Sequence, residues 1–152
     1  MSATFSAINV ETRLEIRDLL SRFCHALDRN LPRQWNDIFT PDAVIDAPKL
    51  GRFAGRAEIA KIPDMVQEKG GGAWRHFLHN IYIDLADNGR DLLIAAYCTV
   101  SDWRTQGNVI RCWDLSARIT RRRGLRIVAL TLTMVGDERL SPPKATSQTI
   151  SD

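Results

Sequence analysis

The fold is decided by residues 74–136, which read WRHFLHNIYIDLADNGRDLLIAAYCTVSDWRTQGNVIRCWDLSARITRRRGLRIVALTLTMVG. Four segments of this stretch, at about 74–86, 92–104, 108–121 and 125–136, are rich in the β-branched and aromatic residues that favour strands. The connections between them are short and contain glycine: Asp87-Asn88-Gly89-Arg90, Gln106-Gly107 and Arg123-Gly124. Because turns of this kind join antiparallel neighbours, the stretch predicts a meander of long strands.

Helical spacing precedes this meander. Asn9 is suited to cap a helix that begins at Val10, and apolar residues then recur at helical intervals to about Arg29. A second, short helix is expected after Leu31-Pro32, since proline suits the first turn of a helix. Thr40-Pro41-Asp42 is expected to end that helix.

The segment between the second helix and the meander is more broken. It predicts a short strand at residues 43–45 and a turn or second short strand at 51–55. A third helix is expected to start near Gly55, with a kink or an early end at Pro63. Gly70-Gly71-Gly72 is interpreted as a flexible break. Three helices followed by a curved meander indicate an α+β fold, in which helices cover one face of the sheet.

Length and composition set the limits of function. The 152 residues are enough for one domain, expected over 1–136, with 137–152 as a flexible C-terminal tail. A composition of 44% hydrophobic and 26% charged residues is typical of a globular protein. The longest uncharged apolar run, 92–101, is shorter than the ~20 residues of a membrane helix. Residues 1–10 carry no export signal, so a cytoplasmic location is expected.

Charge and cysteine content argue against a nucleic-acid-binding protein and against a protein held together by disulfides or thiolate-bound metal. The net charge of +3 comes from scattered arginines rather than a basic stripe, so no nucleic-acid partner is expected. Three cysteines are an odd number with no close pair. This spacing argues against a disulfide framework and against a thiolate metal site. No glycine-rich phosphate loop is present, and no cofactor is expected.

The first long strand has no face that looks like a solvent face. Strict alternation places Phe77, His79, Ile81, Ile83 and Leu85 on one side and Trp74, His76, Leu78, Asn80 and Tyr82 on the other. Either a second subunit or a ligand cavity must cover what the helices leave open. We expect a homodimer through the outer sheet face, with Phe77, Ile81, Ile83 and Leu85 in the contact.

A series of short motifs carries a resemblance to a known family. The motifs are Ala26-Leu27-Asp28-Arg29, Trp35 with Phe39-Thr40-Pro41-Asp42-Ala43, Gly55-Arg56-Ala57-Glu58-Ile59 and Arg75-His76-Phe77-Leu78-His79-Asn80. In this order and spacing the chain resembles the SnoaL-like branch of the nuclear transport factor 2-like superfamily, over about residues 11–135. The resemblance implies a cone-shaped α+β barrel, with three N-terminal helices on a curved, mixed, mostly antiparallel sheet around an apolar pocket.

The same resemblance implies an activity. Related catalysts include scytalone dehydratase, hexachlorocyclohexane dehydrochlorinase, bile-acid dehydratases, polyketide cyclases and ketosteroid isomerases. In the eliminating members an aspartate that ends the first helix pairs with a histidine on the first long strand, and these positions match Asp28 and His76. The implied function is a cofactor-independent lyase or isomerase acting on a small hydrophobic substrate, aromatic or polycyclic in type. The alternative is a non-catalytic ligand-binding or structural oligomerising subunit of the same fold.

The two candidate catalytic residues each have a simpler interpretation. Asp28 continues the line of Leu20 and Cys24 at helical spacing, so it is either a paired carboxylate facing the pocket or a solvated helix end. His76 is either a general base beside that carboxylate or a hydrogen-bonded core residue. His76 and His79 are three apart on a strand and point to opposite faces, so no metal site is expected.

Aromatic and polar residues suggest a lining for the pocket. We expect substrate contacts from Phe23, Trp35, Trp74, Asn80, Tyr97 and Cys112. Tryptophans in such a lining would suit a flat ligand, although core packing also explains most of them. Asn80 and Tyr97 are candidate donors to an oxyanion, or else satisfy backbone groups. Phe23 and Cys24 stand where the resembling dehydratases often have a tyrosine.

Overall fold

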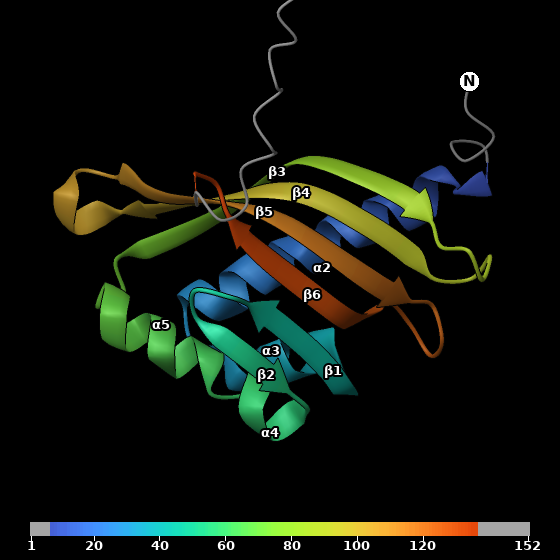
Figure 1. The fold of residues 1–152 in the computed structure, drawn as a ribbon, viewed down its shortest axis with the longest axis horizontal. Helices are drawn as coiled ribbons and strands as arrows, with labels where there is room; N and C mark the ends of the chain where they lie inside the picture. Colours follow the sequence, from blue (N-terminus) through green and yellow to red (C-terminus); the bar gives the residue numbers. More distant parts are fainter. Residues whose placement is uncertain (1–6, 137–152) are drawn as a thin grey trace, which may run out of the picture.

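One six-stranded sheet in the order β2-β1-β6-β5-β4-β3 organises the computed structural model, which describes residues 7–136 (Figure 1). The strands are β1 Phe39–Ala47, β2 Gly51–Ala54, β3 Trp74–Leu85, β4 Leu92–Asp102, β5 Asn108–Thr120 and β6 Arg126–Met134. Only β1 and β6 pair in parallel, so the sheet is mixed and mostly antiparallel, as predicted. Because β2 and β3 are unpaired on their outer sides, the curved sheet is open.

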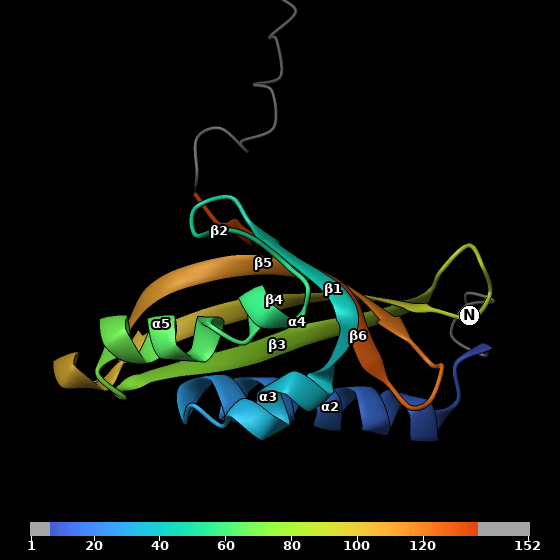
Figure 2. The same cartoon turned by 90° about the horizontal axis from the view of Figure 1, so that it is seen from below.

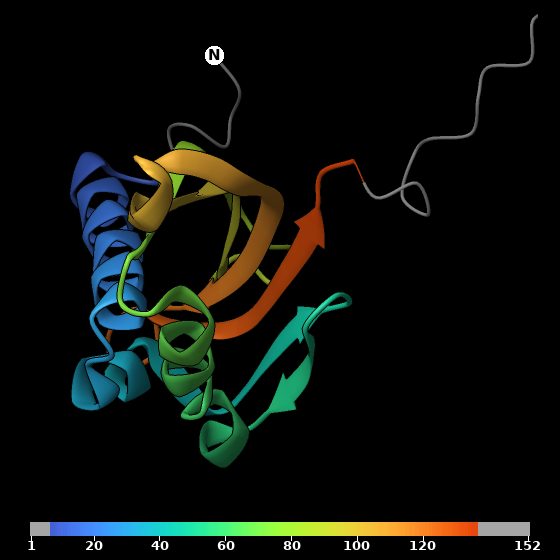
Figure 3. The same cartoon turned by 90° about the vertical axis from the view of Figure 1, so that its left-hand side faces the viewer.

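Helices cover the concave side and one end of this sheet. They are α2 Val10–Asp28, α3 Pro32–Ile38, α4 Arg56–Ile59 and α5 Ile62–Gly70, with a 3-10 turn at Trp103–Thr105. Figure 2 shows α2 and α3 along one side of the sheet, and Figure 3 shows how the sheet curls, with α5 at the open end of the curve. Asn9 caps α2 by accepting the Thr12 N–H at 2.8 Å. The α+β prediction is confirmed.

Three local predictions need correction. Strand β1 begins at Phe39 rather than Ala43, so residues 40–42 lie within the strand, at a register shift against β6 that accommodates Pro41. The third helix is divided into α4 and α5, with Pro63 in the first turn of α5. The three glycines are no flexible break, because Gly70 is buried as the last residue of α5 and Gly71 is its left-handed cap.

A bulge in β3 overturns the predicted alternation of that strand. His79 pairs with Tyr97 and Tyr82 pairs with Ala95, so β3 has one residue more than β4 between these pairs. Asn80 has a φ of 53° at this point, which asparagine tolerates better than most residues. Each residue after the bulge therefore faces the side opposite to the predicted one. The side chains that turn inward, and so leave the predicted dimer contact, are Ile81, Ile83 and Leu85.

The core lies between the helices and the concave face of the sheet. An aromatic group at its centre joins α2, α3 and β1, with the ring centroids of Trp35 and Phe39 4.8 Å apart and those of Trp35 and Phe23 5.1 Å apart. The Trp35 indole donates to the Ile59 carbonyl at 2.9 Å, which ties α3 to α4. No helix within residues 7–136 is long and apolar enough to cross a membrane. The predicted tail, 137–152, lies outside the described residues.

Candidate functional site

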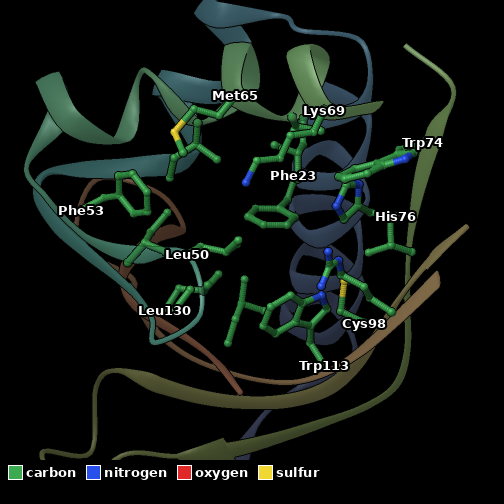
Figure 4. A pocket seen from close by; sticks show the side chains of 18 of the residues that line it. Phe23, Leu50, Phe53, Met65, Lys69, Trp74, His76, Cys98, Trp113 and Leu130 are labelled. Atoms are coloured by element: carbon green, nitrogen blue, oxygen red, sulfur yellow. The ribbon is translucent and has the colours of Figure 1, made fainter. Parts of the chain in front are cut away.

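A cavity of about 100 Å³ lies between the concave face of the sheet, helices α2 and α5, and the β1–β2 hairpin (Figure 4). Its walls are mostly apolar, and the polar or charged side chains on them are few. The lining residues from the helices and the hairpin are Phe23, Leu27, Trp35, Ile45, Ala47, Leu50, Phe53, Ile62, Met65, Val66 and Lys69. Those from the remaining strands are Trp74, His76, Cys98, Val100, Arg111, Trp113, Leu130 and Leu132.

His76 and Asp28 form a buried pair at one wall of this cavity. The Asp28 Oδ1 lies 2.6 Å from the His76 ring Nδ1, and Asp28 Oδ2 accepts the backbone N–H of His76 at 3.0 Å. Their side chains are only 6% and 11% exposed. Asp28 is therefore the paired carboxylate and not the solvated helix end. His76 itself lines the cavity, next to Trp74 in the close-up of Figure 4.

The position of Asp28 is electrostatically unfavourable without this partner. It is the last residue of α2, where the helix dipole presents its negative end. Burial of an unpaired carboxylate would add a further cost. Two hydrogen bonds from His76 offset these terms, and the Gln67 amide of α5 donates to the Asp28 carbonyl at 2.8 Å. The end of α2 is thereby joined to both β3 and α5.

Two cysteine thiols that are shielded from solvent lie close to the pair. Burial raises the pKa of the Cys24 thiol to about 12, and nearby Cys98 and Asp28 add to the rise. Burial likewise raises the pKa of Cys98 to about 12, with Asp28 as the next cause. Interactions between charges are stronger in such a low-dielectric region than in water. Water competes little for the hydrogen bonds between Asp28 and His76, whose side chains are almost fully buried.

This geometry sets which ring nitrogen of His76 can do chemistry. An ionised carboxylate only accepts hydrogen bonds, so Nδ1 carries the proton in the neutral ring, and this tautomer is inferred from the contact. The lone pair is then on Nε2, which has no hydrogen-bond partner among the residues the structure describes. An imidazole held in this way can accept a proton from a molecule in the cavity.

A second polar network supports the same wall. The Trp74 indole donates to Asp102 Oδ2 at 3.1 Å, and Arg104 Nη2 donates to the same oxygen at 2.6 Å. The guanidinium of Arg104, which also bonds the other oxygen through Nε, holds the pKa of Asp102 well below its usual value. Arg104 Nη2 further reaches the Lys69 carbonyl at 3.3 Å. The network holds Trp74 between the β4–β5 hairpin and the end of α5.

Two cations at the cavity are additions to the predicted site. Lys69 follows Ile62, Met65 and Val66 at helical spacing, so the inward stripe of α5 contained the signal for it. Arg111 is two residues before the buried Trp113 on β5, so strand alternation places it on the same face. Both are exposed residues of the kind that sequence reasoning assigns to solvent.

The predicted substrate contacts divide into two groups. Phe23, Trp35 and Trp74 line the cavity together with His76. Three other predicted contacts are absent from the lining and lie on the convex face of the sheet: Asn80, Tyr97 and Cys112. Asn80 occupies the β3 bulge, Tyr97 alternates with the buried Ala96 and Cys98, and Cys112 alternates with Trp113. Alternation along the strand directs Tyr97 and Cys112 away from the cavity, and the bulge takes Asn80 out of the lining.

No group of three or more His, Cys, Asp or Glu side chains within residues 7–136 is arranged to hold a metal ion. His76 and His79 lie on opposite faces of β3, as their spacing predicts, and His79 Nε2 lies 3.0 Å from Thr99 Oγ1 on the outer face.

This chain is similar to one protein family and to several solved structures. A family model described as a SnoaL-like domain matches residues 9–124. A protein of unknown function with a cystatin-like fold from Nostoc punctiforme superposes with a TM-score of 0.75 at 18% identity, over 86% of this chain and 96% of that one. No protein with a curated description matches the sequence at a significant level.

Two further structures share this fold. Aln2 from a Streptomyces species has a TM-score of 0.72 at 21% identity, over 83% of this chain and 92% of that one. A protein from Catenulispora acidiphila, solved in complex with S-DNPA, has a TM-score of 0.67 at 21% identity, over 83% and 95% of the two chains. At such identities the likeness is one of fold.

Proposed function

The chain belongs to the SnoaL-like domain family, and from this premise we propose that it is a cofactor-independent lyase or isomerase of the dehydratase type. Its substrate is a small hydrophobic molecule with a carbonyl or another electron-withdrawing group. The superfamily to which this domain points includes polyketide cyclases and isomerases. His76 is the base of the proposed reaction, and Asp28 holds and orients it.

One observation carries this proposal: the buried contact of 2.6 Å between Asp28 and His76 at the wall of an apolar cavity. A histidine that was hydrogen-bonded only to backbone groups, away from the cavity, would favour a structural role. Here one nitrogen is held by the carboxylate, while the ring borders the cavity. A fixed imidazole that borders an apolar cavity is suited to proton transfer to or from carbon.

The proposed chemistry begins at a C–H bond next to the electron-withdrawing group. His76 Nε2 takes the proton, and the imidazolium that forms is stabilised by the Asp28 carboxylate. In an elimination, the electron pair of the C–H bond becomes a carbon–carbon double bond as the neighbouring leaving group departs and takes the proton from the His76 imidazolium, which restores the neutral base. In an isomerisation, the imidazolium returns the proton to a different carbon.

A non-catalytic role is the second candidate, and one observation favours it. Phe23 and Cys24 occupy positions where resembling dehydratases often carry a proton-donating tyrosine. Asn80 and Tyr97, the expected oxyanion donors, lie outside the cavity. In this alternative the cavity holds a ligand without converting it. The two candidates differ in one measurable property, the loss of a proton from carbon.

Proton abstraction is measured without the natural substrate, by following exchange of the α-protons of 2-indanone in deuterated buffer by NMR. We expect His76→Ala to lower the enzyme-dependent rate by about 10²–10⁴-fold and Asp28→Asn to lower it as well. His79→Ala is the matched control, because this histidine lies on the outer face. Thermal melts establish that all variants are folded. A folded His76→Ala variant that exchanges protons as fast as the wild type contradicts the proposal.

We also propose that the protein forms a homodimer through the outer face of β3 and β4. The large exposed side chains there are Phe77, Tyr82, Leu93 and Tyr97. The dimer contact expected from strict alternation was Phe77, Ile81, Ile83 and Leu85. Of these four residues only Phe77 points outward, so Tyr82, Leu93 and Tyr97 take the place of the other three.

A further inference from the structure

A basic side chain shares one cross-strand row with the proposed base. His76 pairs with Val100, and Val100 pairs with Arg111, so the three residues lie side by side on β3, β4 and β5. Directly paired residues point to the same face of a sheet. All three line the cavity, which establishes that this is the concave face. With strands about 4.8 Å apart, Arg111 is about two strand spacings from His76.

A second cation approaches from the opposite layer. Lys69, in the last turn of α5, lines the cavity, and in Figure 4 its terminal nitrogen is directed toward the middle of the space, beside Phe23. Neither the Lys69 ammonium nor the Arg111 guanidinium has an ion pair or a hydrogen bond within residues 7–136. The described cavity lining contains no aspartate or glutamate. Asp28, the carboxylate next to the cavity wall, is already bonded by His76.

The cavity therefore combines an apolar interior with two uncompensated positive charges. Both charged residues are exposed, which places them at the rim of the cavity rather than at its bottom. Long basic side chains commonly pack their methylene stems on apolar surface while the charged end stays near water. Such a rim favours a ligand whose body is apolar and whose one end is anionic.

We infer that the cavity binds hydrophobic carboxylic acids, whose carboxylate is held by Arg111 and Lys69 while the apolar body lies against the tryptophans beside His76. This inference rests on the proposed function and narrows its substrate class. A guanidinium fork binds both oxygens of a carboxylate, and Lys69 adds a second charge. Because the cavity volume is only about 100 Å³, the acid chosen for the test has one ring and a short chain.

The test compares an acid with its uncharged amide. Isothermal titration calorimetry measures the affinity of 3-phenylpropionate and of 3-phenylpropanamide, which have the same ring and chain. We expect the acid to bind the wild-type protein at least about tenfold more tightly. Because the pair of charges lies at a solvent-exposed rim, added salt should weaken binding of the acid and leave that of the amide nearly unchanged.

Substitutions at the two cations test whether they cause the preference for the acid over the amide. Arg111→Gln and Lys69→Gln are each expected to reduce the acid-to-amide ratio at least about threefold, and the double variant to abolish it. Arg122→Gln, in the β5–β6 turn, and Lys61→Gln, at the start of α5, remove the same charges away from the cavity and should keep the ratio. Equal binding of acid and amide, no measurable binding of the acid, or an unchanged ratio in the double variant overturns the inference.

The outcome is independent of the catalytic proposal. An acid preference that depends on Arg111 and Lys69, with proton exchange unaffected in His76→Ala, contradicts the proposed reaction and supports the ligand class. Proton exchange that depends on His76, without any acid preference, supports the reaction and overturns the ligand class.

Discussion

His76 bonds both oxygens of Asp28, one through its ring and the other through its backbone N–H, across a separation of 48 residues in the chain. The backbone bond fixes where the strand passes the end of α2, and the ring bond fixes how the imidazole is turned. The contact thus links the fold to the orientation of the proposed base. A substitution at Asp28 should affect both.

The first prediction concerns the stability of this contact. Asp28→Ala leaves the buried His76 N–H and ring without their acceptor, so the free energy of unfolding should fall by about 2–4 kcal/mol. Relief of the unfavourable helix-end charge makes the loss smaller than it would otherwise be. Denaturant unfolding is the measurement. Asp37→Ala, an exposed carboxylate on α3, is the control and should change stability by less than about 0.5 kcal/mol. Equal stability of the two variants would refute the prediction.

The second prediction concerns thiol reactivity. With pKa values of about 12, the thiols of Cys24 and Cys98 are protonated at neutral pH, and only thiolates react rapidly with disulfide reagents. At about pH 8 the native protein should therefore react at Cys112 alone, and the denatured protein at all three cysteines. Titration with an aromatic disulfide reagent, with peptide mapping of the modified sites, is the check. Rapid labelling of Cys24 in the native state would show that its thiol is not shielded from solvent.

The third prediction concerns acid. The hydrogen bonds from Arg104 lower the pKa of Asp102 below its ordinary value of 3.8. A carboxyl with a lowered folded pKa contributes stability that is present above its unfolded pKa and is lost as pH falls through the folded pKa. The melting temperature of the wild type should therefore fall more steeply than that of Asp102→Asn below about pH 4. Parallel melting curves for the two proteins across this pH range would contradict the assigned role.

The fourth prediction concerns Gly70. A Cβ atom at this position would lie 2.7 Å from Cγ of Trp74, closer than packed atoms tolerate. Gly70→Ala must displace the tryptophan that forms a wall of the cavity, so it should destabilise the protein by about 1–3 kcal/mol and weaken ligand binding. Glu68→Ala, exposed in the same helix, is the control. Tryptophan fluorescence and denaturant unfolding report the two effects, and an unchanged emission spectrum would show that Trp74 does not move.

Much of the fold follows from local patterns in the sequence. The three hairpin connections, the cap at Asn9 and the proline start of α3 lie where the residues predict them. These features depend on neighbouring residues alone. The pairing of Asp28 with His76 spans 48 residues, and the sequence suggests it only through the resemblance to a family.

The incorrect predictions for the sheet have one main physical source, which is the face of the sheet to which each strand residue points. A single extra residue at Asn80 reverses every later side chain of β3, and asparagine is a weak signal because it also occurs in ordinary turns. The sequence spacing contained a signal for both cations. Arg111 is two residues from the buried Trp113 on β5, and Lys69 continues the inward-facing residues of α5 at helical spacing. Their charge makes them look like solvent-facing residues until the register of neighbouring strands places them at the cavity.

The last prediction concerns the outer face of the sheet. Tyr82 and Tyr97 are 63% and 52% exposed on β3 and β4, and Phe77 and Leu93 extend the same patch. Monomeric proteins seldom expose a contiguous apolar patch of this kind, and β3 is also an edge strand. Two copies related by a two-fold axis would bury the patch against itself.

Sedimentation equilibrium at micromolar concentration should therefore give the mass of a dimer, twice 17.2 kDa. Tyr97→Lys places a charge in the centre of the contact and, facing its own copy, should shift the protein to monomer while its melting curve stays cooperative. Leu14→Lys, which changes another exposed apolar residue, on α2, is the matched control and should remain dimeric. A wild-type monomer, or a Tyr97→Lys dimer as stable as the control, would mean that this face of the sheet is not the interface.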